Sequence, residues 1–577
     1  MSTTVAEMIV TALADQGVRT VWGVVGDALN PVTDAIRRED RLEWIGVRHE
    51  EVAAFAAGAQ AQLSGTIGVC MGTVGPGSIH LLNGLYDAKK SHAPLLAICG
   101  QVPLEELGTD YFQEVNNDLL FSDVAVFTRT ISSPTQASTL LEQAVQAALS
   151  GPGVAVLTLP GDVGGADLPK DATPPRFIDS HPPTAPAMET LQKAADLING
   201  ASTVTMLVGQ GAREARAEVL ALAEQLKSPM VLTLKAKEGL EFNNPYQVGQ
   251  SGLIGNPATT RAFEGGDVLL MIGTDFPYRE WYPQGKTVIQ IDARPEHLGR
   301  RIPIALGLVG HAEPTVAALR KLVDEKTETS HLDSARSHYE SWCERQQALT
   351  NPKHDETLIG RVQKHFDNTD ERIRPELLAQ AVDRHAAPDA VFTTDTGMST
   401  VWLSRFVTMS DRRSLLGSFN LGSMANAMPQ ALGAAALDRH RQVVAFCGDG
   451  GLSMLLGDLI TAVSHDLPVK LIVFNNGRLG MVKLEQEQVG LPEFGTVLAN
   501  PDFAAVARAI GLHAVRVEDP ADVDAAVRDA LAHDGPVLLD VVTNPEEIAV
   551  PGKVKVAQGW GFAIAKIRES LLSQGDS

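Results

Sequence analysis

Short apolar runs alternate with helical patterns along most of the chain. Residues 66–73, 94–100 and 153–163 (TIGVCMGT, PLLAICG, GVAVLTLPGDV) are apolar and end in or beside turn-forming residues, as buried strands do. Stretches with helical periodicity, 78–87 and 136–148, lie between them. This alternation is typical of βαβ units, so the sequence predicts an α/β fold built on parallel sheets.

The alternation stops at residues 168–189, where six prolines predict an extended linker. A second α/β block follows and ends near residue 322. A charged, helix-prone region, 324–372, leads to a third block. We therefore predict three parallel-sheet α/β domains with boundaries at 1–182, 183–340 and 341–577, the last including the charged linker and a C-terminal tail.

Composition narrows the class of protein. A chain of 577 residues is too long for one core, and its net charge of −22 argues against a nucleic-acid partner. The four cysteines lack metal-type spacing, as expected for reduced thiols in a cytoplasmic protein. The N-terminus lacks the pattern of a signal peptide and predicts a helix capped by Ser2 or Thr3. No apolar run reaches the roughly 18 residues that a membrane span needs.

One stretch combines two strands with polar residues at their ends. Residues 441–451 (RQVVAFCGDGG) predict a strand and a glycine turn, 452–465 an amphipathic helix, and 468–476 (PVKLIVFNN) the next strand. Asp449 and Asn476, 27 residues apart, would then lie at the carboxyl ends of parallel strands, where open α/β sheets bind ligands. Oxygen ligands suit Mg²⁺, and glycines let backbone N–H groups approach a diphosphate. The simpler interpretation is turn chemistry alone.

The GDG and NN pair resembles the diphosphate motif of thiamin diphosphate (ThDP) enzymes. Residues 74–88 (VGPGSIHLLNGLYDA) and 415–435 (LLGSFNLGSMANAMPQALGAA) resemble the pyruvate oxidase and pyruvate:quinone dehydrogenase family. This resemblance covers nearly the whole chain. It implies two ThDP-binding folds flanking a central FAD-binding domain, with ThDP, Mg²⁺ and FAD as cofactors.

The resemblance also assigns coenzyme residues in the third domain. The Gly422 carbonyl would accept from the ThDP amino group, and Met424 would hold the two rings in a bent shape, although a methionine here could also be core filler. The implied metal ligands are Asp449, Asn476 and Arg478. The implied ThDP-binding residues are Gly422, Ser423, Met424, Asp449, Gly450, Gly451, Asn476 and Gly480.

The first domain supplies the acid that ThDP chemistry requires. Glu50 follows a predicted strand and begins an alanine-rich helix. A carboxyl group bonded to the pyrimidine nitrogen drives the tautomerisation that activates ThDP, and it works best when semi-buried with a raised pKa. The alternative is an acid placed at a helix N-terminus because the helix dipole favours it there.

The central domain raises the question of a flavin. Gly209-x-Gly211 follows a predicted strand, but a lone GxG is a weak nucleotide signal. Residues 251–255, 273–281 and 288–299 match the stretches where the oxidase branch holds FAD. The implied FAD-binding residues are Ser251, Gly252, Leu253, Ile254, Thr274, Asp275, Phe276, Pro277, Tyr278 and Asp292.

By the same resemblance, His80, Phe112 and Gln113 would face pyruvate, while Met481 and Glu485 would close the site from a partner subunit. The alternative for His80 is a buried histidine satisfied by backbone groups.

The implied activity is oxidative decarboxylation of pyruvate to acetate and CO₂, with electrons passed through FAD to a quinone. Glu50 and Asp449 lie in different domains and relatives assemble the site across a dimer, so we expect a homodimer at minimum and a homotetramer as the assembly. We expect a cytoplasmic enzyme with at most weak, transient contact with the inner face of the cell membrane. The alternatives are a carboligase resembling acetolactate synthase, with structural FAD, and a non-catalytic ThDP-binding regulatory protein.

The C-terminal residues, 557–577, generate a prediction about lipid. Membrane-activated members of the family end in an amphipathic helix. Here the apolar stripe is interrupted by Glu569, and Lys566 and Arg568 are its only basic residues. Each would add about 1 kcal/mol near an anionic surface. We expect anionic liposomes to accelerate pyruvate-driven quinone reduction less than tenfold, and the pyruvate-reduced protein to remain unbound in flotation; stable co-flotation would contradict this.

Overall fold

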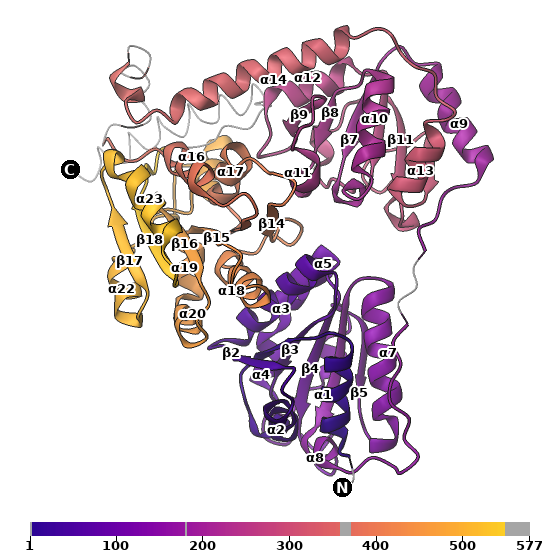
Figure 1. Ribbon diagram of the computed structural model, residues 1–577, viewed down its shortest axis with the longest axis vertical. Helices are drawn as coiled ribbons and strands as arrows, with labels where there is room; N and C mark the ends of the chain where they lie inside the picture. Colours follow the sequence, from indigo (N-terminus) through magenta and orange to yellow (C-terminus); the bar gives the residue numbers. More distant parts are fainter. Residues whose placement is uncertain (1–2, 179–181, 358–359, 361–367, 369–370, 548–577) are drawn as a thin grey trace.

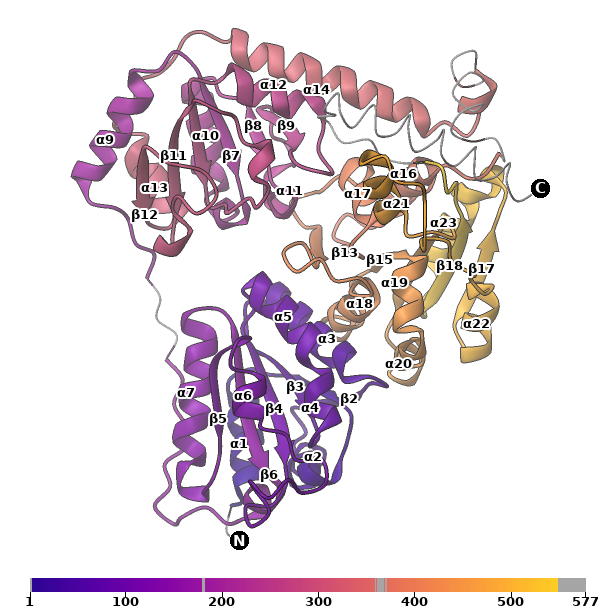
Figure 2. The same ribbon diagram turned by 180° about the vertical axis from the view of Figure 1, so that it is seen from behind.

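The protein is described by a computed structural model over residues 3–178, 182–357, 360, 368 and 371–547. Three sheets, each of six parallel strands, confirm the predicted α/β fold with three parallel-sheet domains (Figures 1 and 2). The residues of the lipid prediction lie outside the described part. Within it, no helix combines the length and apolar character that crossing a bilayer requires.

The first and third sheets share one topology. The N-terminal sheet has the order β2-β1-β3-β4-β6-β5, and the C-terminal sheet has the matching order β14-β13-β15-β16-β18-β17. The N-terminal strands are β1 (Thr20–Gly23), β2 (Glu43–Gly46), β3 (Gly68–Gly72), β4 (Leu95–Gln101), β5 (Ala125–Thr130) and β6 (Val154–Pro160). The C-terminal strands are β13 (Val391–Thr394), β14 (Ser414–Gly417), β15 (Val443–Gly448), β16 (Val469–Asn475), β17 (His513–Val517) and β18 (Val537–Val542).

The central sheet has the order β12-β11-β10-β7-β8-β9. Its strand order reverses between β7 and β10, which is the place where open α/β sheets bind ligands. Its strands are β7 (Val204–Val208), β8 (Met230–Leu232), β9 (Gln247–Gln250), β10 (Val268–Ile272), β11 (Thr287–Asp292) and β12 (Leu306–Val309).

Helices cover the faces of all three sheets (Figures 1 and 2). Those of the N-terminal domain are α1 (Val5–Asp15), α2 (Asn30–Arg38), α3 (Glu50–Ser64), α4 (Pro76–His80), α5 (Leu82–Ser91), α6 (Asn117–Leu120), α7 (Ala137–Ser150) and α8 (Gly161–Gly165). The central region holds α9 (Met188–Asn199), α10 (Arg216–Leu226), α11 (Leu234–Leu240), α12 (Pro257–Gly265), α13 (Ala312–Leu319) and α14 (Ser330–Leu349). The C-terminal domain holds α16 (Pro375–His385), α17 (Met398–Phe406), α18 (Ala427–Leu437), α19 (Asp449–Met454), α20 (Leu459–Ser464), α21 (Gly480–Gln488), α22 (Phe503–Ile510) and α23 (Val523–Ala532).

Two local predictions need correction. The first helix is capped by Thr4, because Thr4 and Glu7 form a reciprocal capping box that neither Ser2 nor Thr3 offers. The helix predicted over 452–465 is broken into α19, a 3₁₀ turn at Leu456–Asp458 and α20. The break lies where the side chain of Asp458 accepts hydrogen bonds from the N-terminal domain.

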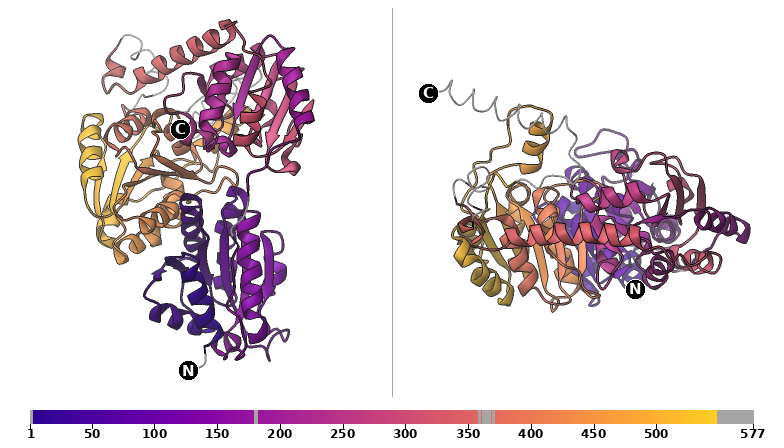
Figure 3. Two further views of the ribbon diagram at one scale, coloured as in Figure 1. Left: turned by 45° about the vertical axis from the view of Figure 1, so that its right-hand side comes forward. Right: turned by 90° about the horizontal axis from the view of Figure 1, so that it is seen from above.

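The long helix α14 joins the central and C-terminal domains (Figure 3). Arg336 donates to the carbonyl of Gln247 in the central domain, and Arg405 of α17 stacks on Trp342 at 5.7 Å. The boundary predicted after residue 340 therefore falls inside a helix that contacts both domains.

The N-terminal and C-terminal domains meet through α3 and α18, which lie side by side (Figures 1 and 2). Buried side chains of both domains form one continuous apolar cluster. Both helices are rich in alanine, so their backbones approach closely. A Cβ on Gly433 would lie 2.2 Å from the carbonyl oxygen of Ala56.

The central domain is attached to the C-terminal domain through α11 and the residues that follow it. Glu238 accepts a hydrogen bond from the Leu415 amide at 2.9 Å, and Glu241 accepts one from the Met409 amide at 2.8 Å. Both amides belong to the segment that enters β14 and leads to the loop preceding α18.

We predict that Gly433→Ala destabilises the protein. Its methyl group would force two backbones apart; overpacking of this kind costs about 1–3 kcal/mol, more than the roughly 1 kcal/mol gained in helix propensity. Calorimetry should show a lower melting temperature for the transition that includes the two outer domains. Gly457→Ala is the matched control, since a Cβ there meets nothing within 4 Å. Equal melting temperatures for the two variants would contradict the close contact.

Candidate active site

The turn that contains Asp449 follows β15 at the point where the C-terminal sheet reverses its strand order. β15 pairs with β13 on one side and with β16 on the other. The segments after these three strands therefore meet at one edge of the sheet, as the sequence predicts for Asp449 and Asn476.

Asp449 is buried and bonded directly to the turn after β16. Its Oδ2 accepts from the Gly477 amide at 2.7 Å and from Asn500 Nδ2 at 2.8 Å, and its Oδ1 accepts from the Gly450 amide. Burial raises the pKa of the Asp449 carboxyl, and these donors oppose the rise. The structure thus brings the GDG and NN turns together. Sequence reasoning missed Asn500, which comes from a later loop.

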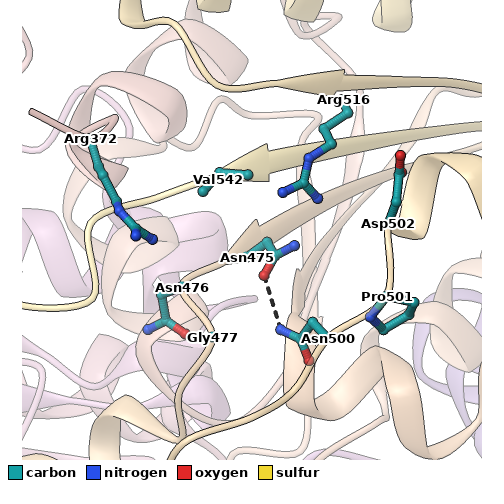
Figure 4. A pocket seen from close by; sticks show the side chains of 9 residues that line it. All are labelled: Arg372, Asn475, Asn476, Gly477, Asn500, Pro501, Asp502, Arg516 and Val542. Atoms are coloured by element: carbon teal, nitrogen blue, oxygen red, sulfur yellow. Dashed lines mark hydrogen bonds between the residues drawn. The ribbon is translucent and has the colours of Figure 1, made fainter. Parts of the chain in front are cut away.

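Two cavities of about 390 and about 420 Å³ adjoin the second turn, and Arg372, Asn476 and Gly477 line both. In Figure 4 the side chain of Asn475 is turned toward Asn500, at 2.9 Å, while Asn476 lies on the other side of the strand end. The Asn476 carboxamide oxygen accepts from the Arg478 amide at 3.0 Å. Together with the Arg478 carbonyl, the Asp449 carboxylate and the Asn476 carboxamide would offer only oxygen donors, which fits Mg²⁺.

A second acid, Asp395, links the GDG turn to the start of α18. It is buried after β13; its Oδ2 accepts from the Gly448 amide at 3.0 Å and its Oδ1 from the Ala427 amide at 2.9 Å. A Cβ on Gly451 would lie 2.4 Å from Oδ2, so this glycine is required for the close approach. Burial raises the pKa of Asp395 to about 7. The strand-ending TTDTG was the sequence signal for this residue, and it was overlooked.

The loop before α18 lies between the GDG turn and the N-terminal domain. The Ser423 amide donates to Ser418 Oγ at 2.9 Å, and Gly422 has a φ of 79°, which favours glycine. A Cβ on Gly450 would lie 3.3 Å from Met424 Cε, so Met424 packs over the turn. Asn83 donates to Ser423 Oγ at 2.9 Å across the domain interface.

Glu50 lies at this same interface. It is 7% exposed and begins α3, with its Oε2 2.9 Å from His80 Nδ1. The imidazole of His49 caps α3 by accepting from the Glu51 amide, and its ring stacks on His80 at 4.5 Å. Glu51 in turn accepts from Asn83 at 2.7 Å, the residue bonded to Ser423. Glu51, the residue next to the predicted acid, is therefore linked through Asn83 to the loop that carries Ser423.

The residues predicted to face pyruvate lie on α4 and on a neighbouring loop, and those predicted to close the site lie on α21. His80 is half-exposed, Phe112 is 78% exposed, and the carbonyl oxygen of Gln113 lies 2.7 Å from where a Cβ on Gly75 would be. Gly75 caps α4, so this loop lies beside the helix that carries His80. On α21, Met481 packs against the C-terminal core.

The residues predicted to hold FAD gather where β10 and β11 end. Phe276 packs edge-on against Tyr278 at 5.5 Å, and a Cβ on Gly252 would lie 3.1 Å from the Phe276 ring. Asp292 is buried and accepts from the Arg294 amide at 2.9 Å. Burial raises the pKa of Tyr278, and Glu485 of α21 adds to the effect, so the two domains adjoin here.

The GxG of the central domain has a structural reason. A Cβ on Gly209 would lie 2.3 Å from the carbonyl oxygen of Gly273, and the Gly211 amide donates to that oxygen at 3.0 Å. The glycines therefore let the loops after β7 and β10 pack together at the reversal of strand order.

Basic side chains of the N-terminal and central domains lie together beyond the end of β11. Burial, together with the nearby charges of Arg294, Lys235, His297 and Arg300, lowers the pKa of His92 to about 4. The ring of His92, at the end of α5, lies 6.0 Å from that of His297 in the central domain. An anionic ligand such as a nucleotide diphosphate would compensate this positive charge. The sequence scatters these residues over two domains, so the cluster was not predicted.

Comparison with known proteins agrees with the fold and the two turns. Sequence profiles of thiamine pyrophosphate enzymes match the chain in three parts: the N-terminal TPP binding domain over residues 3–120, the central domain over 191–319, and the C-terminal TPP binding domain over 395–541.

Three relatives match along most of their length. A thiamine pyrophosphate-containing protein of Bacillus subtilis, YdaP, is 36% identical over 97% of this chain and 95% of its own. Pyruvate oxidase of Lactiplantibacillus plantarum is 30% identical over 92% and 87% of the two chains. The acetolactate synthase large subunit of Corynebacterium glutamicum is 29% identical over 94% and 87%. The predicted resemblance to ThDP enzymes is thus confirmed, and the chain belongs to the thiamine pyrophosphate enzyme family.

Proposed function

We propose that this protein is a ThDP- and FAD-dependent enzyme that oxidises pyruvate to acetate and CO₂ and passes the electrons to a quinone. The observation that carries the proposal is the link from Glu51, the residue next to Glu50, through Asn83 to Ser423 across one interface. An acid from one α/β domain thereby adjoins a loop that also contacts the GDG turn of another.

The chain offers groups for each part of ThDP. Asp449, Asn476 and the Arg478 carbonyl would hold Mg²⁺ and through it the diphosphate, while the Gly422 carbonyl and Met424 would orient the rings. When bound, ThDP supplies a nucleophilic carbon and an electron sink for decarboxylation. Glu50 would bond to the pyrimidine nitrogen of ThDP. Its burial keeps water from competing for that hydrogen bond.

His80 would connect the buried Glu50 carboxylate to substrate through hydrogen bonds. Its Nδ1 bonds to Glu50, while its side chain remains 44% exposed on the open side. A histidine in this position can move a proton between substrate or water and the interior of the site. Phe112 and Gln113 lie on the neighbouring loop, where they would bind a small 2-oxo acid and exclude water.

The central domain is proposed to hold FAD, on three observations. Its strand order reverses between β7 and β10, the place where open α/β sheets bind ligands. Aromatic side chains and the buried Asp292 line that end of the sheet, and basic groups from two domains surround it. The charge of Glu485 on α21 contributes to the raised pKa of Tyr278, which supports a flavin close to the C-terminal domain. The relative named pyruvate oxidase supports both pyruvate and oxidation.

The second candidate is a carboligase that makes acetolactate and keeps FAD as a structural group. It is favoured by relatives named acetolactate synthase, whose identity of 29–31% matches that of the oxidase. A ThDP-binding protein without turnover is the third possibility. The intact Glu50–His80 pair argues against it, because binding alone needs no proton-transfer groups.

We propose a homodimer as the minimal unit and a homotetramer as the assembly, in the cytoplasm. Apolar side chains gather on the loop after α21, where Val489 is 71%, Leu491 50% and Phe494 84% exposed. An exposed apolar loop of this kind is suited to contact with another copy of the chain. Contact with the membrane would be transient, while reduced flavin passes electrons to quinone.

The test of the reaction is anaerobic mixing of the protein with ThDP, Mg²⁺ and pyruvate while the flavin absorption is followed. We expect the flavin band to bleach and acetate to form. Glu50→Gln should still bind ThDP but react about 10²–10⁴-fold more slowly, because the amide cannot share a proton with the pyrimidine. Acetolactate without bleaching would establish the carboligase, and near-normal rates in the variant would reject the role of Glu50.

A second prediction concerns the metal. Asp449→Ala should abolish Mg²⁺-dependent ThDP binding in calorimetry, because the variant loses the only carboxylate in the proposed donor set. Flavin content should be unchanged, since the two cofactors are assigned to different domains. Unaltered ThDP affinity would show that the diphosphate binds elsewhere.

A further inference from the structure

The turn before α3 is fixed by an acid of another domain. Asp458, in the 3₁₀ turn after α19, accepts from the Arg48 amide through Oδ1 at 2.8 Å and from the His49 amide through Oδ2 at 3.1 Å. Asp458 is 1% exposed. Its Oδ1 also accepts from Thr461 Oγ1 at 2.8 Å, so the carboxylate is held by its own domain while it binds the other.

The two amides immediately precede Glu50. The backbone at residues 48–50 passes from extended conformation into the first turn of α3, where His49 is the N-cap. The same turn is bonded on its own side by the Val47 amide, which donates to the Gly23 carbonyl. The position of the Glu50 Cα relative to the C-terminal domain is therefore set by the bonds that Asp458 makes.

Asp458 is also close in sequence to the metal-binding turn. Asp449 begins α19, and Asp458 ends the 3₁₀ turn that follows it. A short segment thus carries the proposed magnesium ligand at one end and the acceptor for the Glu50 turn at the other. This explains why the helix predicted over 452–465 is broken, since an uninterrupted helix would direct the residue 458 side chain elsewhere.

Other contacts bind the preceding strand but lie farther from Glu50. His465 Nε2 accepts from the Gly46 amide at 3.2 Å, and Arg439 pairs with Glu43 at 2.7 Å. They secure β2 at the edge of its sheet. Asp458 is the contact next to the acid itself.

We propose that Asp458 is a positioning residue for Glu50, holding its carboxylate in register with the ThDP site across the domain interface. The inference rests on the proposed role of Glu50 toward ThDP. Glu50 Oε2 is 2.9 Å from His80, and a Cβ on Gly77 would lie 3.2 Å from Oε1, so the carboxylate has little room to move. Misplacement of a reacting group by about 1 Å can reduce a rate about 10²-fold.

The first test measures hydrogen exchange of backbone amides and requires no catalytic turnover. In Asp458→Asn the amide group turns an N–H donor toward one of the two backbone donors, so that bond is lost. We expect whichever of the Arg48 and His49 amides loses its acceptor to exchange with deuterium at least tenfold faster in the ThDP-free protein. Thr461→Val is the matched control: it removes the third donor to Asp458, leaves both backbone bonds, and should leave this exchange unchanged. Unchanged protection in Asp458→Asn would overturn the proposal.

The second test measures proton exchange on bound ThDP in the absence of substrate. Exchange of the proton on the reactive ThDP carbon, followed by NMR with Mg²⁺ present, should be about 10–100-fold slower in Asp458→Asn. ThDP affinity should stay within about twofold of the wild type, because the GDG and NN turns are intact. A merely structural role would weaken binding instead, and that result, or normal exchange, would overturn the proposal. If Asp458→Asn does not fold, Asp458→Glu, which displaces the carboxylate by one methylene, should show the same slower exchange.

Pyruvate is absent from both measurements. Failure of the pyruvate assignment would therefore leave this result standing, and failure of the positioning role would leave the proposed reaction unaffected.

Discussion

α3 and α18 approach so closely that a methyl group on Gly433 would lie 2.2 Å from the Ala56 carbonyl oxygen. Small side chains along both helices allow this distance, and a shared apolar cluster stabilises it. The N-terminus of α3 carries Glu50, and the loop before α18 carries Gly422, Ser423 and Met424. If the two helices were separated by larger side chains, these groups would no longer face one ligand. The helix contact is therefore the constraint on which the candidate site depends.

Around that contact, buried acids hold loops through backbone amides. Asp395 binds Gly448 and Ala427, and Asp458 binds Arg48 and His49. Hydrogen bonds to a charged acceptor contribute about 1.5–3 kcal/mol each, and a buried amide left without one costs about 1–3 kcal/mol. These hydrogen bonds therefore restrict the positions of the loops, because a loop that shifts leaves both the acid and the amides without partners.

The sequence was sufficient for the fold and for the meeting of Asp449 with the NN turn, because strands that are parallel and adjacent end at one edge. It also placed Glu50 at the start of a buried helix. Asp395, Asn500 and Asp458 were not predicted, since each looks like an ordinary turn or helix residue until the tertiary structure brings its partner close. The basic cluster around His92 was hidden for the same reason. The N-cap was misplaced by a small shift, because a capping box can only be recognised by testing each register in turn.

The outer sheets have the same strand order, so β2 and β14 correspond, and with them the helices that follow, α3 and α18. The contact between the two domains is thus made by equivalent elements of two copies of one architecture. A larger residue accepted by one helix has to be matched by a smaller one from its counterpart. Over evolution the pair is then expected to diverge as a unit, while strands and helices remote from it change freely. The contact between α3 and α18 therefore couples the sequences of the two domains.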